Sequence, residues 1–525
     1  MKIAASVTST GMGMKRQVNG QTSHFLGTVR RKSRMMIVGV TAFLCLLPFF
    51  TLTAQEGDFK LREVNVRDST LSLTQSIQIA LANNNQIKRA MLDVRSADQD
   101  VRRAWSAVLP DISGSMGYTR NYEIPKTFLP EALIREGGST TKLVPVAFGT
   151  DNNWQGGFTA EQTLFNGQAF VGISTSTLFK TAQTERYRQT AQQVVTQTRK
   201  AFYNVLIAKE NVRLQRSRIE RLEANLKDNQ SRQKAGMLDD YQVLQVEVQL
   251  SNERPQLTEA KYDLEQANRQ LKMVMGIPLD MQFDVIGDLQ NYDLTGNRVE
   301  SNQNNALKKV NRMTPMVLDS TDWLMNKAKE FRGDLRALEV QKQLKNKEIK
   351  ALQSQYLPTL SASYDLNWTA VEPDAPNFFG NDDQRSRSRT LALNLQVPIF
   401  QGFSRDADVT QAKIEREDIA LQREQARRQA RNEIKSAKES LQQALETVTS
   451  RELALKKARR GYEMARARLK EGVGSQLDVT NAELELRQAE LNYARTIYNF
   501  LSAKAEYDNA VGMVPYVDKN TDLTH

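Results

Sequence analysis

The second half of this chain repeats the plan of the first half, and this duplication constrains the fold more than any other feature. The segment Ala235–Pro278 holds a glycine turn, a helical run and a closing Gly-Ile-Pro, and Glu471–Pro515 repeats that plan about 236 positions later. The match extends outward, because Leu109-Pro110 corresponds to Leu357-Pro358. Each half therefore has the predicted order helix, strand, strand, very long helix, tight turn, helix.

This repeat divides the chain into four predicted regions. They are a leader at 1–54, a first repeat at 55–278, an irregular equatorial connector at 279–320 and a second repeat at 321–525. The first repeat is predicted to hold strands at about 111–122 and 153–165, followed by a long helix at about 168–235. The second repeat is predicted to hold strands at about 359–369 and 389–400, followed by a long helix at about 403–471. Half-length helices are predicted at roughly 73–108, 239–275, 323–356 and 475–511, stacked end to end to match the long ones.

The predicted strands are clearest in the second repeat. Apolar residues alternate with polar ones from Leu360 to Trp368 and again from Leu391 to Ile399. Each run is about ten residues long, which is the length of a tilted strand that crosses a membrane. A water-exposed, half-buried hairpin would alternate in the same way. The secretory leader favours membrane strands.

Each long helix carries apolar residues at alternating steps of four and three, which is the heptad stripe of a coiled coil. The first stripe runs from Val194 to Leu226 and the second from Ile434 to Leu469. Both are interrupted at the same height by a strongly polar residue, Gln215 or Arg451. Such a residue either fixes the register of the coiled coil or marks a groove position that contacts a partner.

The first 54 residues have the pattern of a secretory signal, with basic residues at Arg30–Arg34 followed by an apolar run. This leader holds seven of the 72 Lys and Arg residues and none of the 61 acidic residues, so the formal charge of +11 falls to +4 in the mature chain. A chain so close to neutral gives no reason to expect nucleic acid as a partner.

The mature chain lacks the residues that much catalytic chemistry requires. The one cysteine, Cys45, and one of the two histidines, His24, lie in the leader, and His525 is the last residue. No phosphate-binding loop or nucleophile set appears. The sequence therefore predicts no catalytic residues, no metal site, no cofactor and no enzyme activity. Beyond the leader there is no apolar run of about 18 residues, so a membrane role would have to use strands.

Four strands cannot close a membrane barrel, since the smallest such barrels have eight. Open edges are not tolerated in lipid, so the chain must oligomerise. A dimer would supply eight strands, whose interior side chains fill. A trimer would supply twelve strands with room for a channel, and a transport role favours it.

Two segments resemble the TolC-like outer-membrane efflux proteins, the outer-membrane factors of tripartite efflux and type I secretion systems. One is Leu71–Ile87 followed by Leu109-Pro110 and Gly117-Tyr118; the other is Leu469–Ala482, which reads LKEGVGSQLDVTNA. The resemblance covers about Leu71–Pro515. It implies a mainly α homotrimer with membrane β: a 12-stranded β-barrel in the outer membrane stands on a long periplasmic α-helical barrel. It also implies docking to a periplasmic adaptor and an inner-membrane pump, with passive export to the exterior.

The resemblance also marks the periplasmic turns as functional. The family carries acidic residues on the helix after the second turn, where they narrow the entrance; Asp478 matches one of them, and Asn481 replaces the next. The expected gate is therefore a single ring of three aspartates. A helix-capping role explains Asp478 equally well, and capping is favoured for Asp239 with Gln242. The turn residues expected at the adaptor are Gly236, Asp239, Asp240, Gly472, Gly474 and Ser475.

Two other interpretations compete with the exit duct. A periplasmic coiled-coil tether of the cell envelope would explain the long helices but not the strands around Trp368 and 391–399. A secreted enzyme on a stalk is disfavoured by the near absence of histidine and cysteine. Asp382 and Asp383 beside Arg385, Arg387 and Arg389 are interpreted as a solvated charge cluster in an external loop.

Overall fold

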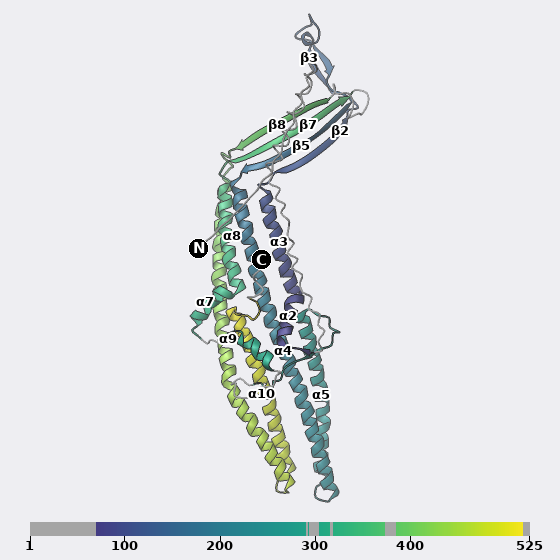
Figure 1. Ribbon diagram of the computed structural model, residues 1–525, viewed down its shortest axis with the longest axis vertical. Coiled ribbons are helices and arrows are strands. Elements are labelled where there is room, and N and C mark those ends of the chain that lie inside the picture. The colour runs from purple at the N-terminus through teal and green to yellow at the C-terminus, as the bar shows by residue number, and fades with distance from the viewer. Residues whose placement is uncertain (1–69, 290–291, 293–303, 315–318, 373–384, 518–525) are drawn as a thin grey trace, which may run out of the picture. The chain divides into compact units, whose positions relative to one another are not determined.

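The computed structural model of the chain describes residues 70–289, 292, 304–314, 319–372 and 385–517. All of them belong to one compact unit, 61–525. The predicted leader, with Cys45 and His24, and the acidic pair Asp382–Asp383 lie outside the described residues. Figure 1 shows the described helices side by side, leading into one sheet.

The two halves have the predicted order of elements. The first contains α2 (Leu73–Asn83), α3 (Asn85–Ser106), β2 (Asp111–Arg120), β5 (Asn152–Phe165), α4 (Gly167–Lys234) and α5 (Asp240–Met275). The second contains α7 (Thr321–Phe331), α8 (Gly333–Ser354), β7 (Thr359–Glu372), β8 (Arg385–Gln396), α9 (Ser404–Lys470) and α10 (Gln476–Val511). The prediction of a duplicated, mainly helical chain with four antiparallel strands is confirmed.

Smaller elements stand outside this plan. A hairpin of β3 (Lys126–Pro130) and β4 (Leu143–Ala147), with the 3-10 turn η1 (Glu131–Leu133), lies in the loop between β2 and β5. In the connector, β6 (Asp284–Val285) pairs in parallel with β1 (Thr70–Leu71), and α6 spans Asn305–Arg312.

The main sheet has the strand order β2-β5-β7-β8, with every neighbouring pair antiparallel. β8 was expected at about 389–400 but runs from Arg385 to Gln396. It starts earlier because β7 continues far enough for Ala370 to pair with Arg385. It stops earlier because Pro398, two residues on, has no N–H to donate to a ladder. The arginines at its start therefore lie on a strand and not in an external loop.

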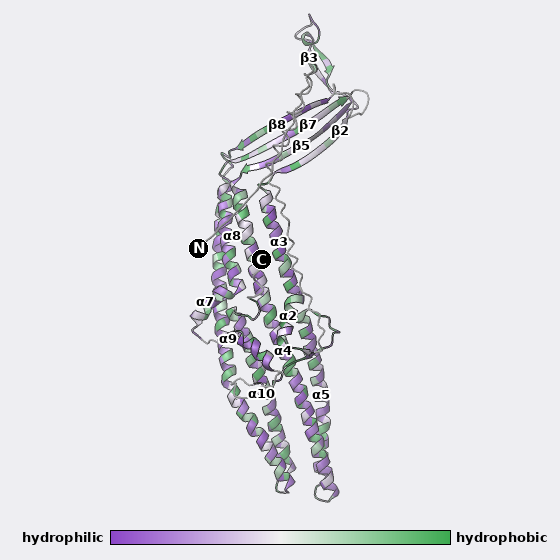
Figure 2. Cartoon of the chain, viewed as in Figure 1, coloured by the Kyte–Doolittle hydropathy of each residue, from purple (hydrophilic) through white to green (hydrophobic). Residues whose placement is uncertain are grey.

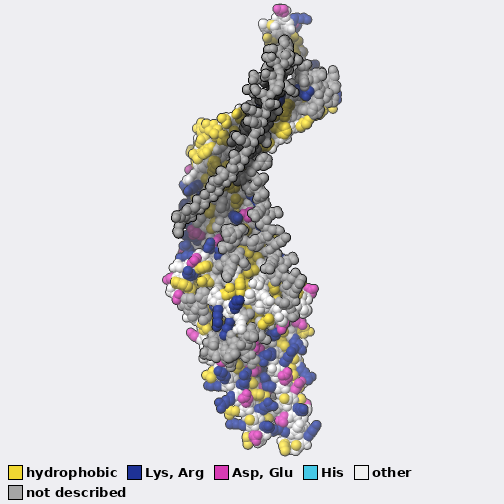
Figure 3. Space-filling model, in the orientation of Figure 1, with side chains coloured by type: hydrophobic (Ala, Val, Ile, Leu, Met, Phe, Trp, Pro, Cys, Tyr) yellow, Lys and Arg dark blue, Asp and Glu magenta, His cyan; other side chains and the backbone are white. Residues whose placement is uncertain are grey.

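The register gives the sheet two faces of opposite polarity. The first, the apolar face, includes Ile112, Met116, Trp154, Phe158, Leu366, Trp368, Leu391 and Leu393. The second, the polar face, includes Ser113, Ser115, Thr159, Asp365, Asn367, Ser386, Ser388 and Asn394. On the polar face the Thr159 hydroxyl donates to the Asp365 carboxylate at 2.8 Å. Hydrophobic side chains gather over the strands, whereas charged side chains crowd the far ends of the helices (Figure 3).

α4 is the central helix. It packs against α3 and α8 in its half nearest the sheet and against α5 and α10 in its other half, while α9 packs against α8 and α10 (Figure 1). Both predicted heptad stripes are largely buried: Val194, Thr198, Ala201, Val205, Val212 and Leu222 on α4, and Ile434, Ala437, Leu441, Ala444, Val448 and Leu455 on α9. Apolar and polar residues alternate around each helix, as Figure 2 shows, so burial is confined to such stripes.

The half-length helices meet end to end, as predicted, but two of them are interrupted where they meet. The predicted helix 73–108 breaks at Asn84 and the predicted helix 323–356 breaks at Arg332, each with extended backbone. The Asn84 carboxamide accepts from the N–H of Gln86 at 2.7 Å and donates to the Val274 carbonyl at 2.7 Å. The Arg332 guanidinium donates to the Ala510 carbonyl at 3.1 Å. Each break thus supplies a partner for the end of the helix that abuts it.

Glycine closes both of these junctions. α5 ends at Gly276 and α10 at Gly512, with left-handed φ of 70° and 82°. A Cβ on Gly276 would lie 2.6 Å from the Asn83 carbonyl oxygen, and one on Gly512 would lie 2.7 Å from the Arg332 nitrogen. The backbone therefore requires glycine at both positions for conformation and for space.

A buried ion cluster joins the connector to the long helices. The Arg199 guanidinium and the Lys504 ammonium both bond the Asp508 carboxylate, Arg199 at 2.7 Å, and all three side chains are at most 2% exposed. Arg199 also donates to Asn311 at 2.9 Å, and Lys504 donates to the Thr314 hydroxyl at 2.6 Å. Removing one partner would leave a buried charge uncompensated, so this cluster fixes α6 and Thr314 against α4 and α10.

We expect Gly512→Ala to lower the free energy of unfolding by about 1–3 kcal/mol, because the new Cβ strains a left-handed residue and meets the Arg332 backbone. The matched control is Gly461→Ala in the last third of α9, where a Cβ meets no heavy atom of another element within 4 Å; it should be stabilising by about 0.5–1 kcal/mol. Thermal unfolding in detergent, followed by circular dichroism at 222 nm, compares them. Equal effects would contradict a tight junction.

Candidate functional site

The helix hairpins α4–α5 and α9–α10 end in matching turns. Gly236 and Gly472 follow the long helices with left-handed φ of 73° and 76°. In the first turn the Met237 N–H donates to the Arg232 carbonyl at 2.9 Å, and an equivalent bond closes the second turn. This closure satisfies carbonyl groups that the helix end would leave unpaired. Both glycines lie in the tight turns that the sequence predicted after the long helices.

The second turn carries a complete capping box. The Ser475 hydroxyl accepts from the Asp478 N–H at 3.1 Å, and the Asp478 carboxylate accepts from the Ser475 N–H at 3.0 Å and hydroxyl at 2.8 Å. These donors lower the pKa of Asp478. Space at Gly474 is tight, because a Cβ there would lie 3.0 Å from the Arg468 Cβ and 3.0 Å from the Leu469 backbone nitrogen. Asp478 and Asn481, one turn apart on α10, are both exposed in the single chain.

The first turn lacks such a box, so the predicted capping by Asp239 and Gln242 is wrong. Asp239 occupies the N-cap position, but its side chain makes no capping hydrogen bond. The Gln242 N–H bonds the Asp239 backbone carbonyl at 3.1 Å instead. Asp240 accepts from the Gln233 carboxamide at 2.6 Å, which ties the start of α5 to the end of α4. The two tips are therefore alike in backbone but different in side-chain chemistry.

Two hydrogen bonds join the hairpins just behind their tips. The Arg232 guanidinium on α4 donates to the Leu469 carbonyl at the end of α9, at 2.9 Å. The buried Asn229 carboxamide, also on α4, donates to the Gln476 side chain at the start of α10, at 3.1 Å. Sequence reasoning missed both contacts, because no pattern within one helix indicates which helix lies opposite.

Further from the tips, six charged side chains from α4, α5 and α10 form an interhairpin charge cluster. Its members are Arg218, Arg221, Glu253, Glu483, Arg487 and Glu490. Arg218 lies 2.8 Å from Glu253, and Arg221 lies 3.5 Å from Glu483 and 3.7 Å from Glu490. Arg487 on α10 reaches Glu253 on α5 at 3.5 Å. Three arginines face three glutamates, so the set is neutral when fully ionised.

Burial shapes the electrostatics of this cluster. The side chains of Arg218, Glu253 and Glu483 are 7%, 5% and 6% exposed. Burial raises the pKa of Glu483 and of Glu490, and burial together with nearby Arg487 lowers the pKa of Arg218. Each charge therefore depends on its partners across the hairpin interface.

The two equivalent polar positions in the heptad stripes have different surroundings. Gln215 is buried on α4, one turn before Arg218, and its carboxamide oxygen has no hydrogen-bond partner among the described residues. Arg451 is exposed on α9 in the single chain. The difference follows from packing, since α4 lies between two hairpin partners and α9 lies at the margin.

A hollow of about 660 Å³ separates the far ends of α4 and α9. Its lining includes Lys227 and Asp228 of α4, Tyr462 and Arg466 of α9, and Val479 of α10. α10 thus fills the space between the long helices only in part. Near the tips the hairpins are joined by the polar contacts described above, whereas the apolar core that α4 shares with α9 and α10 lies nearer the sheet.

The described residues lack two features that other roles would need. Among them, no three or more His, Cys, Asp or Glu side chains group so as to hold a metal ion. In the same part of the chain, none of the helices combines the length and apolarity that a membrane crossing needs.

Comparison with known proteins gives one family. The model of the family described as "Outer membrane efflux protein" matches residues 76–277 and 324–513, which is most of both repeats. The outer membrane protein TolC of Salmonella enteritidis is 21% identical over 452 residues, covering 85% of this chain and 83% of TolC. The alkaline protease secretion protein AprF of Pseudomonas aeruginosa is 20% identical over 448 residues, covering 85% of this chain and 86% of AprF.

Solved structures share the fold. The CmeC outer membrane channel of Campylobacter jejuni superimposes with a TM-score of 0.64 at 19% identity, covering 85% of this chain and 88% of CmeC. The open state of the MtrE outer membrane channel of Neisseria gonorrhoeae gives 0.63 at 16% identity, covering 84% of this chain and 89% of MtrE.

The raised pKa of Glu483 predicts a specific pH dependence. Ionised Glu483 is disfavoured in the folded chain, so its contribution to stability is largest at low pH and is lost as pH rises through its folded pKa. Glu483→Gln does not titrate there. The melting temperature of the variant minus that of the wild type should therefore be more positive at pH 7 than at pH 5.

The control for this prediction is Glu485→Gln, an exposed carboxylate on the same helix. Its melting-temperature difference from the wild type should change less between the two pH values. Thermal unfolding of both variants in the same detergent makes the comparison. An equal change for both would mean that burial of Glu483 has no energetic consequence.

Proposed function

The chain belongs to the outer membrane efflux protein family, and we propose that three copies of it assemble into one exit duct gated at the helix tips. The family consists of channels and not of enzymes. The protein is an outer-membrane efflux channel of the tripartite efflux and secretion class, with a periplasmic helical extension. The observation that carries this assignment is the family match over both repeats.

The trimer is supported by the sheet. β2 and β8 are the edges of a four-stranded sheet, 10 and 12 residues long, and alternate residues of an edge strand turn their backbone N–H and C=O groups away from the sheet. Within lipid each of those groups needs a partner, and β8 of one copy against β2 of the next keeps the alternation antiparallel. Three copies give twelve strands, which leave a passage lined by the polar face.

The partners follow from the family and from the relatives. We propose a periplasmic adaptor and an inner-membrane pump that deliver cargo to the tips Gly236–Asp240 and Gly472–Ser475. AprF is named for alkaline protease secretion, so a protein cargo is one candidate class. The tether alternative predicts recovery in the soluble periplasmic fraction and leaves the apolar face of the sheet unexplained.

The gate is proposed to be the interface between the two hairpins of each copy. The tips are held by two hydrogen bonds, Arg232 to Leu469 and Asn229 to Gln476, and by the interhairpin charge cluster. The hollow beside α10 shows where apolar contact is lacking. Movement of α9–α10 away from α4–α5 would break a small number of polar contacts, and water could hydrate the separated groups.

Reconstitution in a planar lipid bilayer tests the duct. It also tests the latch, by which we mean the two hydrogen bonds from Arg232 to Leu469 and from Asn229 to Gln476. Wild-type protein should give single-channel events, and chemical cross-linking should trap a three-chain species. The double variant Asn229→Ala with Arg232→Ala should raise the conductance several-fold, because it releases α9–α10 from α4.

The control for the two hydrogen bonds is Arg216→Ala with Glu220→Ala, two exposed positions on the same helix that do not line the hollow, which should conduct like the wild type. Absence of any pore would refute the duct. A wild-type conductance in the Asn229/Arg232 variant would refute the latch alone.

Asp478→Ala distinguishes a gate from a cap. If three Asp478 carboxylates form a ring, their removal should raise conductance and weaken block by multivalent cations, because the cations lose their binding site. Ser475→Ala removes the cap hydroxyl but keeps the Asp478 charge, and it should lower the stability of the helix by about 0.5–2 kcal/mol. Cation block that falls equally in both variants, or in neither, would leave Asp478 a capping residue only.

A further inference from the structure

The two helix hairpins form a layer whose outer helices have a free side in the single chain. Toward the tips α4 packs against α5 and α10, and α9 packs against α10, so the order across the layer is α5-α4-α10-α9 (Figure 1). The outer helices of this layer are therefore α5 and α9. In a closed ring of copies, α9 of one copy faces α5 of the next.

The duplication relates these free sides to a contact that exists inside one copy. The glycines that follow α4 and α9, Gly236 and Gly472, are 236 residues apart, and so are Gly276 and Gly512, which follow α5 and α10. Each residue of the first hairpin thus has an equivalent in the second. The inner junction joins α4 to α10. Its equivalent, which we call the outer junction, joins α9 of one copy to α5 of the neighbouring copy.

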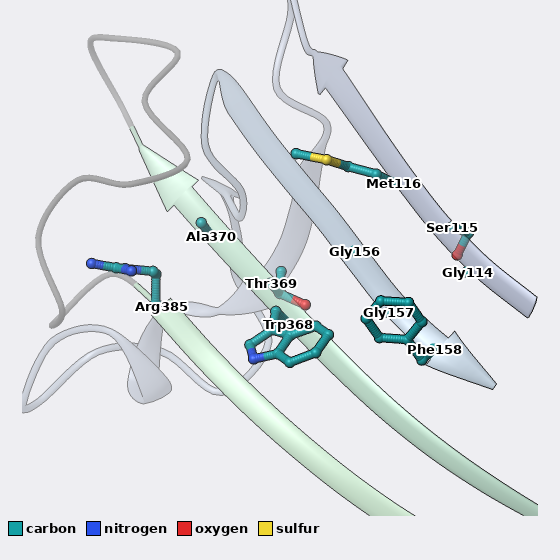
Figure 4. Close-up of a pocket in the computed structure, with 10 residues that line it drawn as sticks. All are labelled: Gly114, Ser115, Met116, Gly156, Gly157, Phe158, Trp368, Thr369, Ala370 and Arg385. Carbon is teal, nitrogen blue, oxygen red and sulfur yellow. The ribbon is translucent and has the colours of Figure 1, made fainter. Parts of the chain in front are cut away.

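The sheet repeats this relation between an inner and an outer junction. Inside one copy β5 of the first repeat pairs with β7 of the second, where Phe158 and Trp368 project side by side with ring centres 5.9 Å apart (Figure 4). The proposed ring pairs β8 of one copy with β2 of the next. The strands and the helices therefore use the same alternation of inner and outer junctions.

The free sides of α9 and α5 carry opposite charge. The segment Ser404–Ser450 of α9 has nine basic and nine acidic residues, whereas Arg451–Lys470, next to the tip, has eight basic and two acidic. On α5 the segment Asp240–Glu265 has six acidic and two basic residues. Of the eight cations near the α9 tip, Lys456 alone forms an ion pair within the described part of the chain, with Glu452 at 3.2 Å. The other seven are available to a neighbouring surface of opposite charge.

α5 also carries a second apolar stripe, on the side away from α4. Its members recur at steps of three, four or seven residues and are exposed in the single chain: Tyr241, Leu244, Val248, Pro255 and Tyr262. Such a repeat is the seam of a coiled coil, here without the helix that covers it. Leu453 and Met464 of α9, at a similar distance from the tips, are about half exposed as well.

An ion pair of the inner junction has an equivalent of the same chemistry on the free sides. Arg221 of α4 lies 3.5 Å from Glu483 of α10. The equivalent positions are Lys457 of α9 and Glu247 of α5, again a cation and a carboxylate. Both are exposed in the single chain, where Glu247 accepts one hydrogen bond, from Gln230 at 3.5 Å.

A hydrogen bond of the inner junction is repeated in the same way. The Arg232 guanidinium donates to the Leu469 carbonyl at 2.9 Å. The equivalents are Arg468 on α9 and the carbonyl of Gln233 at the end of α4. Arg468 is exposed, and within the described part of the chain its guanidinium forms no ion pair or hydrogen bond.

The other hydrogen bond of the inner junction is not repeated. The equivalents of Asn229 and Gln476 are Ala465 and Asp240, and an alanine side chain has no polar group. The outer junction therefore has fewer polar contacts than the inner one.

We propose that Lys457 and Arg468 of α9 bind the α4–α5 hairpin of a neighbouring copy, at Glu247 and at the Gln233 carbonyl, while the exposed stripe of α5 packs against α9. This inference rests on the proposed assembly of three copies. Each hairpin is then held on both sides near its tip. Opening at the tips has to release an outer junction as well as an inner one.

Disulfide trapping tests the outer junction, with the one cysteine of the sequence, Cys45, changed to serine in every variant. Glu247→Cys with Lys457→Cys should give a covalent trimer on mild oxidation of isolated membranes, read on non-reducing gels. A disulfide requires Cα atoms about 4–7 Å apart. Within one copy α4 and α10 lie between these two positions, so the bond has to join different copies.

The matched control is Lys261→Cys with Lys457→Cys. Lys261 is exposed on α5, two heptads beyond Glu247 and about 21 Å further from the tip, so this pair should give at least about tenfold less covalent trimer. Coexpression of the two single variants, Glu247→Cys and Lys457→Cys, should give covalent dimers and no trimers. These substitutions replace exposed side chains and preserve the buried core.

Equal cross-linking of the two cysteine pairs, or a Glu247–Lys457 disulfide confined to single chains, would overturn the proposal. Occupation of this side of α5 by a partner other than a second copy would also leave the cysteines unlinked and overturn it. A conducting trimer without the disulfide refutes this inference alone, whereas absence of any pore refutes the proposed function.

Arg468 is tested by conductance in planar bilayers. Arg468→Ala should raise the conductance about twofold or more, because it removes the hydrogen bond to the neighbouring copy. Arg468→Lys keeps a cationic donor and should conduct like the wild type. A wild-type conductance in the alanine variant would exclude Arg468 from the outer junction.

Discussion

The open edges of the four-stranded sheet are the constraint on which the rest of the structure depends. β2 and β8 have their full lengths available for pairing, and one face of the sheet is apolar while the other is polar. In water the apolar face would be exposed, and in lipid the edge N–H and C=O groups would be unpaired. Both penalties disappear only when the sheet closes with copies of itself inside a membrane. The proposed trimer would remove both penalties, and it would bring the long helices of three copies together below the sheet.

Duplication gives the two halves the same backbone turns and helix breaks, but their side chains make different contacts. α5 and α10 each end in a left-handed glycine, Gly276 or Gly512, which packs against a broken helix. The tips then diverge, because Ser475 and Asp478 cap α10 whereas Asp239 forms no cap on α5. A gate needs this kind of asymmetry, since two identical hairpins in a ring would have no reason for one to move against the other.

The sequence specified the elements well and their contacts poorly. Alternation from Leu360 to Trp368 and the heptad stripe from Ile434 to Leu469 depend on local periodicity, and the strands and long helices appear where those periods predict them. The breaks at Asn84 and Arg332 were missed, because each is stabilised by a carbonyl from a helix about 180–190 residues away along the chain, Val274 or Ala510. Arg385 was placed in a loop because the partner strand that extends β8 is not visible from β8 itself.

The interhairpin charge cluster shows why the same interface can be both specific and separable. A buried set of arginines and glutamates adds little net stability over apolar residues of the same size, because desolvation offsets the attraction. The geometry of the cluster is strict, however, because Glu253 and Glu483 are paired only when an arginine of α4 lies at the same distance from the tips. When the hairpins part, water solvates these groups, whereas an apolar seam would lose its whole burial energy. In the proposed gate, an ionic interface would define one closed register while keeping the free energy of opening small, which is the combination that a gated duct requires.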